Sequence, residues 1–183
     1  MSKKQKEAVR NALLEKRKSL DQAFVFEKSK QIFDKLKTCD EFKHAQHILL
    51  YAAYRGEVLT KDIISEIIST GRKAYLPVLI SKGEFMACEV DDNLKPNKYG
   101  ILEPTHENQR EHFDLIICPG VAFDFLLNRL GFGGGYYDRF LLKRQDVYKI
   151  GLAYDFQIVK SVYAKKHDVA MDMIISEKRI LSL

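Results

Sequence analysis

The sequence has neither the long apolar stretches of membrane proteins nor the paired cysteines of secreted and zinc-binding proteins. No apolar run approaches the roughly 20 residues that a membrane span requires, and the amino-terminal residues are charged, with no apolar signal region. Three cysteines stand far apart among 183 residues and form no Cys-x-x-Cys pair. These absences disfavour a membrane protein, a disulfide framework and a zinc ribbon. We therefore expect a cytoplasmic protein with buried, reduced thiols.

Outside its first 20 residues the chain has no excess of charge of either sign. The formal net charge of +5 equals the excess of seven Lys or Arg over two Glu within residues 1–20. A nucleic-acid-binding domain usually spreads basic residues over a whole face, so an RNA-associated protein led by this segment is the less favoured alternative. Lys6 and Arg10 lie one helical turn apart in it, a spacing that suits a joint grip on a phosphate chain. The confined charge favours one local anionic site.

Internal repeats, linkers and low-complexity segments are also missing, so we expect a single domain over residues 1–183. Apolar periodicity and turn residues predict alternating helices and strands, which imply an α/β layered fold with a mostly parallel sheet flanked by helices. A polar stretch at 91–110 predicts a long surface loop that folds over a ligand. The predicted helices cover 3–18, 21–37, 60–71 and 136–143, and the predicted strands cover 47–54, 73–80, 85–90, 115–118, 148–154 and 171–176.

Glycine is scarce except at one place, where four of the ten glycines fall at 131 and 133–135. Arg129 precedes this glycine loop (131–135), and Asp138 follows it. Backbone N–H groups can approach an anion closely where no Cβ intervenes, and a helix that starts just beyond adds its positive dipole end. No Lys-Ser or Lys-Thr pair follows, so this is not a P-loop, and Tyr136 stands where a dinucleotide fingerprint needs glycine. The loop is typical of a phosphate cradle, and the alternative is a glycine-rich hairpin without a ligand.

Acidic residues follow or precede several of the predicted strands. Ligands bind beyond the carboxyl ends of such strands, so Glu57 and the glycine loop, which each follow a strand, are predicted to face one crevice. Asp168 and Asp172 precede or open the last predicted strand and are predicted to meet Asp138 there as magnesium ligands, because Mg²⁺ prefers carboxylate, phosphate and water oxygens. The alternative is that each is a solvent-exposed turn residue.

Taken together, these residues resemble the 5-formyltetrahydrofolate cyclo-ligase family, also called methenyltetrahydrofolate synthetases. The similarity runs over nearly the whole chain, and its signature is the ten-residue stretch 129–138, Arg-Leu-Gly-Phe-Gly-Gly-Gly-Tyr-Tyr-Asp. The weaker matches occur in the family's order: Lys6-x-x-x-Arg10, Glu57-Val58, Leu76-Pro77-Val78, Gly100-Ile101-Leu102-Glu103-Pro104 and Pro119-Gly120-Val121-Ala122-Phe123-Asp124.

The resemblance implies an ATP- and Mg²⁺-dependent cyclisation of 5-formyltetrahydrofolate to 5,10-methenyltetrahydrofolate, with release of ADP and phosphate. In the implied mechanism the formyl oxygen is phosphorylated and N10 then attacks the activated carbon. The implied fold is similar to the sugar-phosphate isomerase and CoA-transferase group. The implied partners are 5-formyltetrahydrofolate and Mg-ATP, without nucleic acid or membrane, for a monomer or weak homodimer. A different kinase or ATP-dependent ligase that uses the same cradle is the second enzymatic alternative.

The resemblance also implies which residues form the site. Arg129 would be catalytic, by stabilising charge on the transferred phosphoryl group, and Asp138 and Asp168 would hold magnesium. Some members carry a lysine where this chain has Gly134, and Lys3 or Lys4 could replace Lys6 if the amino-terminal match is shifted. The implied ATP-binding residues are Lys6, Arg10, Arg129, Leu130, Gly131, Phe132, Gly133, Gly134, Gly135, Tyr136 and Tyr137. The implied substrate-binding residues are Ala52, Glu57, Gly133, Gly134, Gly135, Tyr136 and Tyr137.

Overall fold

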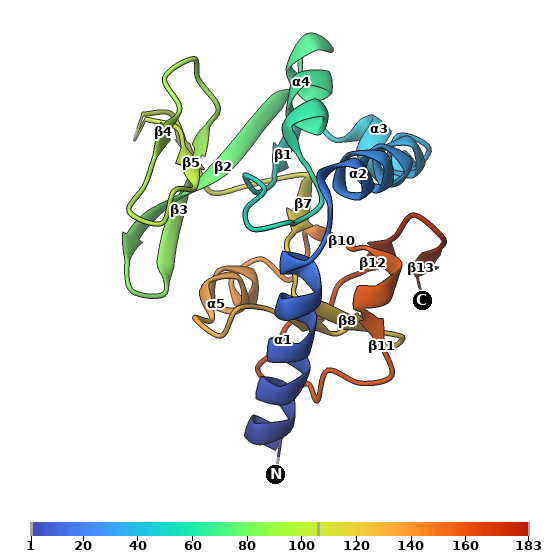
Figure 1. Cartoon of the computed structure of the whole chain (residues 1–183). Coiled ribbons are helices and arrows are strands. Elements are labelled where there is room, and N and C mark those ends of the chain that lie inside the picture. Colours follow the sequence, from blue (N-terminus) through green and yellow to red (C-terminus); the bar gives the residue numbers. More distant parts are fainter. Residues whose placement is uncertain (1, 106, 183) are drawn as a thin grey trace.

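An eight-stranded, mostly parallel sheet forms the centre of the computed structural model, which describes residues 2–105 and 107–182 (Figure 1). Its strand order is β13-β12-β10-β7-β1-β2-β3-β6. The strands from β12 through β2 run parallel, whereas β13 at one edge and β3 and β6 at the other pair antiparallel. This arrangement confirms the predicted α/β class. The strands of this sheet are β1 (His47–Leu49), β2 (Lys73–Ser81), β3 (Glu84–Glu89), β6 (Gln109–Arg110), β7 (Leu115–Cys118), β10 (Tyr148–Leu152), β12 (Met173–Ile175) and β13 (Ile180–Ser182).

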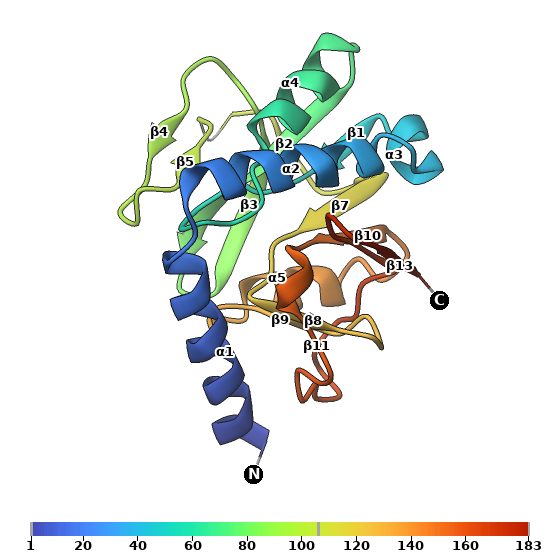
Figure 2. The ribbon, with the colours of Figure 1, turned by 45° about the vertical axis from the view of Figure 1, so that its right-hand side comes forward.

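Alternate side chains of β7 pack into two different cores. Leu115 and Ile117 join the core that includes residues of α2 and α4, whereas Ile116 and Cys118 join the core that includes residues of α5. Successive side chains of a strand point to opposite faces, so helices cover both faces of the sheet (Figure 2). A strand buried on both faces needs no polar alternation, which explains the continuous apolar run. The helices are α1 (Ser2–Lys18), α2 (Gln22–Leu36), α3 (Asp40–His44), α4 (Lys61–Ser69), α5 (Tyr136–Leu142) and the 3-10 turn η1 (Asp155–Gln157).

The amino-terminal helix α1 packs against a second, three-stranded sheet of order β11-β8-β9. Leu13 is buried there with Val121, Leu130 and Val162. The amino-terminal end of α1 extends away from the central sheet in both ribbon views (Figures 1 and 2). This packing brings one face of α1 beside the glycine loop. The strands are β8 (Ala122–Asp124), β9 (Arg129–Leu130) and β11 (Ile158–Val159).

Some predicted boundaries were wrong. The predicted strand 47–54 ends at Leu49, because after Leu50 donates its backbone N–H to the carbonyl of Tyr75 (2.9 Å) the chain leaves the ladder. The stretch 91–110 is not an irregular loop, since it carries the hairpin of β4 (Lys95–Pro96) and β5 (Leu102–Glu103) and then β6. Thr60 precedes α4, but its hydroxyl donates to the carbonyl of Tyr51 (2.6 Å) instead of capping the helix. The sequence patterns also missed α3, β8, β9 and β13.

Two expectations drawn from what the sequence lacks can be compared with the fold. Cys39, Cys88 and Cys118, all within the described residues, are free and buried, as predicted. Among residues 2–105 and 107–182, no helix has the length and apolar character needed to cross a membrane.

Candidate active site

Residues from distant parts of the sequence line one cavity of about 760 Å³. Segment 51–57, which follows β1, and Pro119, which follows β7, form part of its wall. The other side is closed by α1 and the glycine loop. The structure therefore brings together every residue that the resemblance implicated: Lys6, Arg10, Ala52, Glu57, residues 129–138 and Asp168.

The glycine loop has a backbone that other residues adopt only with strain. Gly133 has φ +102° and Gly135 has φ +70°, in a region that glycine enters without a steric penalty. Helix α5 begins at Tyr136, directly after the loop. The run of glycines is thus explained by the turn itself as well as by a ligand that needs a close approach to the backbone.

Two arginines hold the glycine loop from opposite sides. Arg10 of α1 donates from Nε to the carbonyl of Gly131 (2.9 Å). Arg139 of α5 donates to the carbonyl of Gly134 and, over 2.8 Å, to that of Gly83 at the tip of the β2–β3 hairpin. The loop is therefore fixed both to the amino-terminal helix and to the edge of the central sheet.

The β8–β9 hairpin delivers Arg129 to the cavity, and Asp124 holds the turn of this hairpin. The buried carboxylate of Asp124 accepts backbone N–H groups of Leu126 (3.1 Å), Asn128 (3.0 Å) and Val162 (3.1 Å). Each is a charge-assisted hydrogen bond. This aspartate therefore fixes the strand from which Arg129 points.

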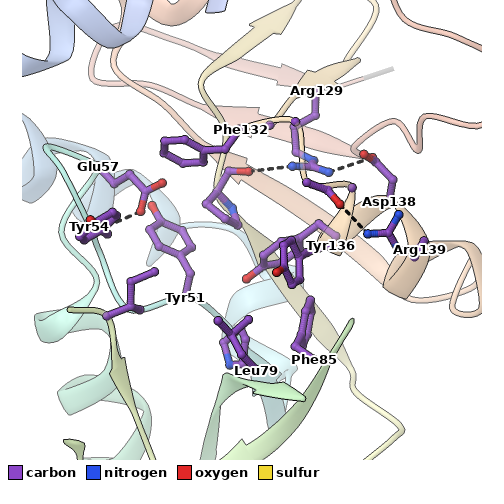
Figure 3. Close-up of a pocket in the computed structure, with 18 of the residues that line it drawn as sticks. Tyr51, Tyr54, Glu57, Leu79, Phe85, Arg129, Phe132, Tyr136, Asp138 and Arg139 are labelled. Carbon is purple, nitrogen blue, oxygen red and sulfur yellow. Dashed lines mark hydrogen bonds and ion pairs between the residues drawn. The ribbon is translucent and has the colours of Figure 1, made fainter. Parts of the chain in front are cut away.

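Arg129 forms an ion pair with Asp138 across the glycine loop (Figure 3). Its Nη2 lies 2.8 Å from Oδ1 of Asp138, and its Nη1 donates to the carbonyl of Pro119 (3.2 Å). The guanidinium also lies 5.5 Å from the ring centre of Tyr137. Neither Nε of Arg129 nor the hydroxyl of Tyr137, both buried, has a hydrogen-bond partner among the described residues. These two polar atoms lie beneath the cavity wall, and the groups of Arg129 with partners are the two terminal nitrogens.

Lys6 forms the second ion pair of this side, with Asp168. Burial alone would raise the pKa of the Asp168 carboxyl, but hydrogen bonds from the Lys6 ammonium and the Lys165 backbone N–H lower that pKa below its ordinary value. Lys3 and Lys4 are exposed and do not line the cavity. Of the three lysines considered for this position, Lys6 is therefore the one that lies at the cavity.

The two aspartates fit magnesium only together with oxygens from a ligand. Among residues 2–105 and 107–182, no group of three His, Cys, Asp or Glu is placed to hold a metal ion. Asp138 and Asp168 both line the cavity, however, and Mg²⁺ is commonly held by one or two carboxylates plus phosphate and water oxygens. Asp172 is different: it pairs with Lys149 (2.9 Å) and is not among the residues that line the cavity. The start of β12 turns the carboxylate of Asp172 toward β10, so the cavity brings Asp138 together with Asp168 and not with Asp172.

Segment 51–57 places one buried carboxylate at the opposite side of the cavity. Glu57 is 7% exposed, and its Oε2 accepts the backbone N–H of Tyr54 (3.0 Å). Its Oε1 lies 3.7 Å from Nη2 of Arg17. Burial raises the pKa of Glu57 to about 7, against the opposing effects of Arg17 and the Tyr54 N–H. This carboxylate is therefore an acceptor whose charge depends on pH near neutrality.

Several cavity residues were not predicted from the sequence. The β4–β5 hairpin contributes Asn97, Tyr99 and Glu103, so the segment 91–110 does line the cavity, and its closure over a ligand stays a prediction. The match at 100–104 was the available signal, but it carried no role. Other residues that the patterns missed are Tyr51, Tyr54, Arg55, Pro77, Leu79, Phe85, Ile101, Leu102, Pro119, Arg139, Leu142 and His167.

The fold is that of an α/β protein, and its cavity has the size and lining of a small-molecule site. The cavity combines the glycine loop, two ion pairs beside it and several aromatic side chains. The 5-formyltetrahydrofolate cyclo-ligase family model matches residues 2–177. The chain therefore belongs to the 5-formyltetrahydrofolate cyclo-ligase family, which is a family of ligase enzymes. This confirms the resemblance read from the sequence.

Individual relatives agree with the family match. The chain is 36% identical to the 5-formyltetrahydrofolate cyclo-ligase of Haemophilus influenzae over 141 residues, which cover 72% of this chain and 75% of the relative. It is 31% identical to the Escherichia coli K12 protein of the same name over 147 residues, covering 74% and 80%. The structure of Aquifex aeolicus 5,10-methenyltetrahydrofolate synthetase superposes with a TM-score of 0.86 at 33% identity, covering 97% of this chain and 92% of that one.

Proposed function

We propose that this protein catalyses the ATP- and Mg²⁺-dependent cyclisation of 5-formyltetrahydrofolate to 5,10-methenyltetrahydrofolate, with release of ADP and phosphate. The observation that carries the proposal is that one cavity joins the glycine loop, its paired charges and the buried Glu57. These groups come from distant segments, and each lies at a position that the family resemblance assigned.

The glycine-loop side is suited to phosphoryl transfer. A formamide is a poor electrophile, so its oxygen must first become a better leaving group, which transfer of the γ-phosphoryl group achieves. Lys6 and Arg10 would bind the triphosphate from α1, and Arg129 would donate to the transferred group. Asp138 and Asp168 would hold Mg²⁺, which supplies positive charge to the triphosphate. Catalysis of this type depends on positioning and charge stabilisation, so no enzyme nucleophile is needed.

The opposite side is suited to orienting the folate. Glu57 in its ionised form accepts hydrogen bonds, and pterin N–H groups are donors of the matching kind. Ala52 lies on the same segment and leaves space beside Tyr51 and Tyr54. Formyl group and γ-phosphate must meet, so residues 133–137 would contact both ligands, and N10 would attack from the folate itself.

The test is the rise in near-ultraviolet absorbance of 5,10-methenyltetrahydrofolate when purified protein meets 5-formyltetrahydrofolate with and without Mg-ATP. A rise that needs both ligands supports the proposal. A flat trace from folded protein that binds ATP would overturn the assigned acceptor and favour a kinase or ligase acting on another compound. Turnover without ATP would overturn the phosphoryl-transfer mechanism.

A further inference from the structure

Arg17 is a buried arginine that lies behind the cavity wall rather than in it. It belongs to the last turn of α1 and is 2% exposed. Its guanidinium donates to the carbonyls of Tyr54 (3.1 Å), Arg55 (2.8 Å) and Gly120 (3.3 Å). Burial lowers the pKa of Arg17, opposed by the negative charge of Glu57. A charged group removed from water destabilises the folded protein unless its contacts compensate for the lost hydration, so the contacts of Arg17 must offset its burial.

The same guanidinium contacts two cavity residues from the rear. Its Nη2 lies 3.7 Å from Oε1 of Glu57, and its Cζ lies 5.4 Å from the ring centre of Phe132 in the glycine loop. Glu57 and Phe132 both line the cavity, and in Figure 3 the ring of Phe132 extends from the glycine loop toward Glu57. Phe132 keeps 47% of its surface exposed. One cation therefore lies behind both a mostly buried carboxylate and a half-exposed aromatic ring that line the cavity.

We propose that Arg17 is the positioning residue of the folate side: it fixes the carboxylate of Glu57 and the ring of Phe132 where both meet the pteridine. This inference rests on the proposed function. Arg17 does not touch the substrate. By bonding to the carbonyls at 54 and 55 it fixes the turn that presents Glu57, and by stacking on Phe132 it ties that turn to the glycine loop. A planar donor with several N–H groups can make all these contacts at once, which an ammonium cannot.

Arg17 also decides how easily Glu57 ionises. The titratable groups that face Glu57 are Arg17 from α1, Tyr51 from the segment after β1, Tyr137 from α5 and Tyr154 from the segment after β10, whose hydroxyl donates to the Glu57 carbonyl (3.1 Å). Among these groups Arg17 is the one that carries a positive charge. Removing it leaves the desolvation of Glu57 unopposed except by the Tyr54 N–H, so the pKa of Glu57 rises further above about 7.

The experiment compares Arg17→Met and Arg17→Lys with the natural protein in the pH dependence of KM for 5-formyltetrahydrofolate. The natural protein should bind the folate better as pH rises through about 7, where Glu57 ionises. Arg17→Met should move this inflection upward by about one pH unit or more, which lowers the ionised fraction of Glu57 at pH 7 from about one half to about one tenth. KM at pH 7 should therefore rise by roughly fivefold or more and recover in part at higher pH. KM for Mg-ATP should stay within about twofold. Arg17→Lys should lie between the two.

Two controls separate positioning from general damage. Arg144→Met removes another arginine that bonds to backbone carbonyls, those of Glu111 and Phe140, outside the cavity, and should lower stability without moving the inflection. In a Glu57→Gln background, Arg17→Met should raise the folate KM by less than it does in the natural protein and by the same factor at every pH, because only the positioning of Phe132 is then lost. An equal loss at every pH when Glu57 is present, or a loss in the Glu57→Gln background as large as that in the natural protein, would overturn the inference.

A carbon-13 NMR titration of the Glu57 carboxyl in the protein without ligands tests the same point independently of turnover. The signal is assigned by its loss in Glu57→Gln. If the Arg17→Lys protein shows an unchanged Glu57 pKa, the inference fails even where the cyclisation is observed. If the natural protein forms no 5,10-methenyltetrahydrofolate, the proposed function fails, and the titration still decides whether Arg17 controls Glu57. Arg17→Lys keeps this test available should Arg17→Met not fold.

Discussion

The carboxylates on the two sides of the cavity differ in how strongly nearby cations stabilise their charge. On the glycine-loop side, the carboxylates of Asp138 and Asp168 are each paired with a cation, Arg129 and Lys6. On the side of segment 51–57, the carboxylate of Glu57 also has a cation nearby, Arg17 at 3.7 Å, but burial among tyrosines outweighs this charge and raises the pKa of Glu57 to about 7. The first arrangement compensates full charges in place. In the second arrangement the carboxylate is close to protonation at neutral pH.

Under the proposed function, this difference would let one cavity bind two unlike ligands. A triphosphate with Mg²⁺ brings charges of both signs and needs partners that can be exchanged. A pteridine brings neutral N–H groups and a flat apolar surface, and needs a fixed acceptor in a dry wall. The predictions below test whether the two sides are as separate as the structure indicates.

The largest effect is expected on the glycine-loop side, from Arg129→Ala. Arg129 should contact the transferred phosphoryl group most strongly in the transition state, so kcat should fall by roughly two to three orders of magnitude while folate binding changes much less. Steady-state kinetics with each ligand varied separately will measure both. Arg144→Ala serves as the matched control, because that arginine lies outside the cavity. Equal losses of kcat and folate affinity would contradict the assigned role.

The second prediction concerns stability, on the side of segment 51–57. Protonated Glu57 is favoured in the folded state, so its contribution is complete below its ordinary pKa of 4.5 and is lost as pH rises through about 7. The free energy of unfolding of the natural protein, relative to Glu57→Gln, should therefore fall by about 3 kcal/mol between pH 4.5 and pH 8.5. Urea unfolding of both proteins at several pH values measures this. A difference that does not vary with pH would show that Glu57 is not desolvated.

The third prediction concerns magnesium. Asp138→Asn should raise the Mg²⁺ concentration needed for half-maximal activity by about tenfold, because a carboxylate ligand becomes a neutral amide. Asp172→Asn is the control, since that aspartate is also ion-paired but lies outside the cavity. The two variants are compared in Mg²⁺ titrations at saturating ATP and folate. An unchanged metal dependence in Asp138→Asn would remove this residue from the ligand set.

The smallest effect is expected from Gly133→Ala. A Cβ at this position meets no atom closer than 3.5 Å, so the cost comes from the backbone, whose φ of +102° disfavours alanine. Affinity for Mg-ATP should fall by roughly fivefold, with the folate affinity less affected. Gly71→Ala has φ +76° and open space around its Cβ, away from the cavity, so it should lower stability alone. Calorimetric titration with Mg-ATP compares the two variants with the natural protein. If Gly133→Ala binds Mg-ATP as tightly as the natural protein does, the loop conformation is not needed for binding.

The sequence predicted the parallel core well because its strands are buried on both faces. The run 115–118 needs no partner information to be recognised as a strand. The β8–β9 hairpin was missed because its strands are only three and two residues long and wholly buried, so they show no alternation. Its turn depends on the carboxylate of Asp124, whose partner Val162 lies far along the chain. Such a contact has no local signal.

The sequence signals for the cavity residues are local, whereas the contacts that support these residues are not. The glycine loop and the implicated cations, which all line the cavity, could be found in the sequence because their spacing and the family motif are local features. The burial of Arg17 could not be predicted, since a helix pattern with several cations along one edge does not show which of them has backbone carbonyls to bond. The pairing of Asp172 could not be predicted for the same reason, because its partner, Lys149, belongs to the neighbouring strand of the sheet.

The pairing of Lys6 with Asp168 and of Arg129 with Asp138 has a consequence for how ligands enter. Without ligands these four groups are electrically neutral as a set. Entry of Mg-ATP would then be an ion exchange, in which the aspartates pass from cations of the protein to the metal, and the freed cations pass to phosphate oxygens. An exchange of this kind changes the net number of contacts with salt ions little. Affinity for Mg-ATP should accordingly depend less on ionic strength than it would at a site of unpaired lysines and arginines, and a simple polyanion should bind poorly because it offers nothing to the carboxylates.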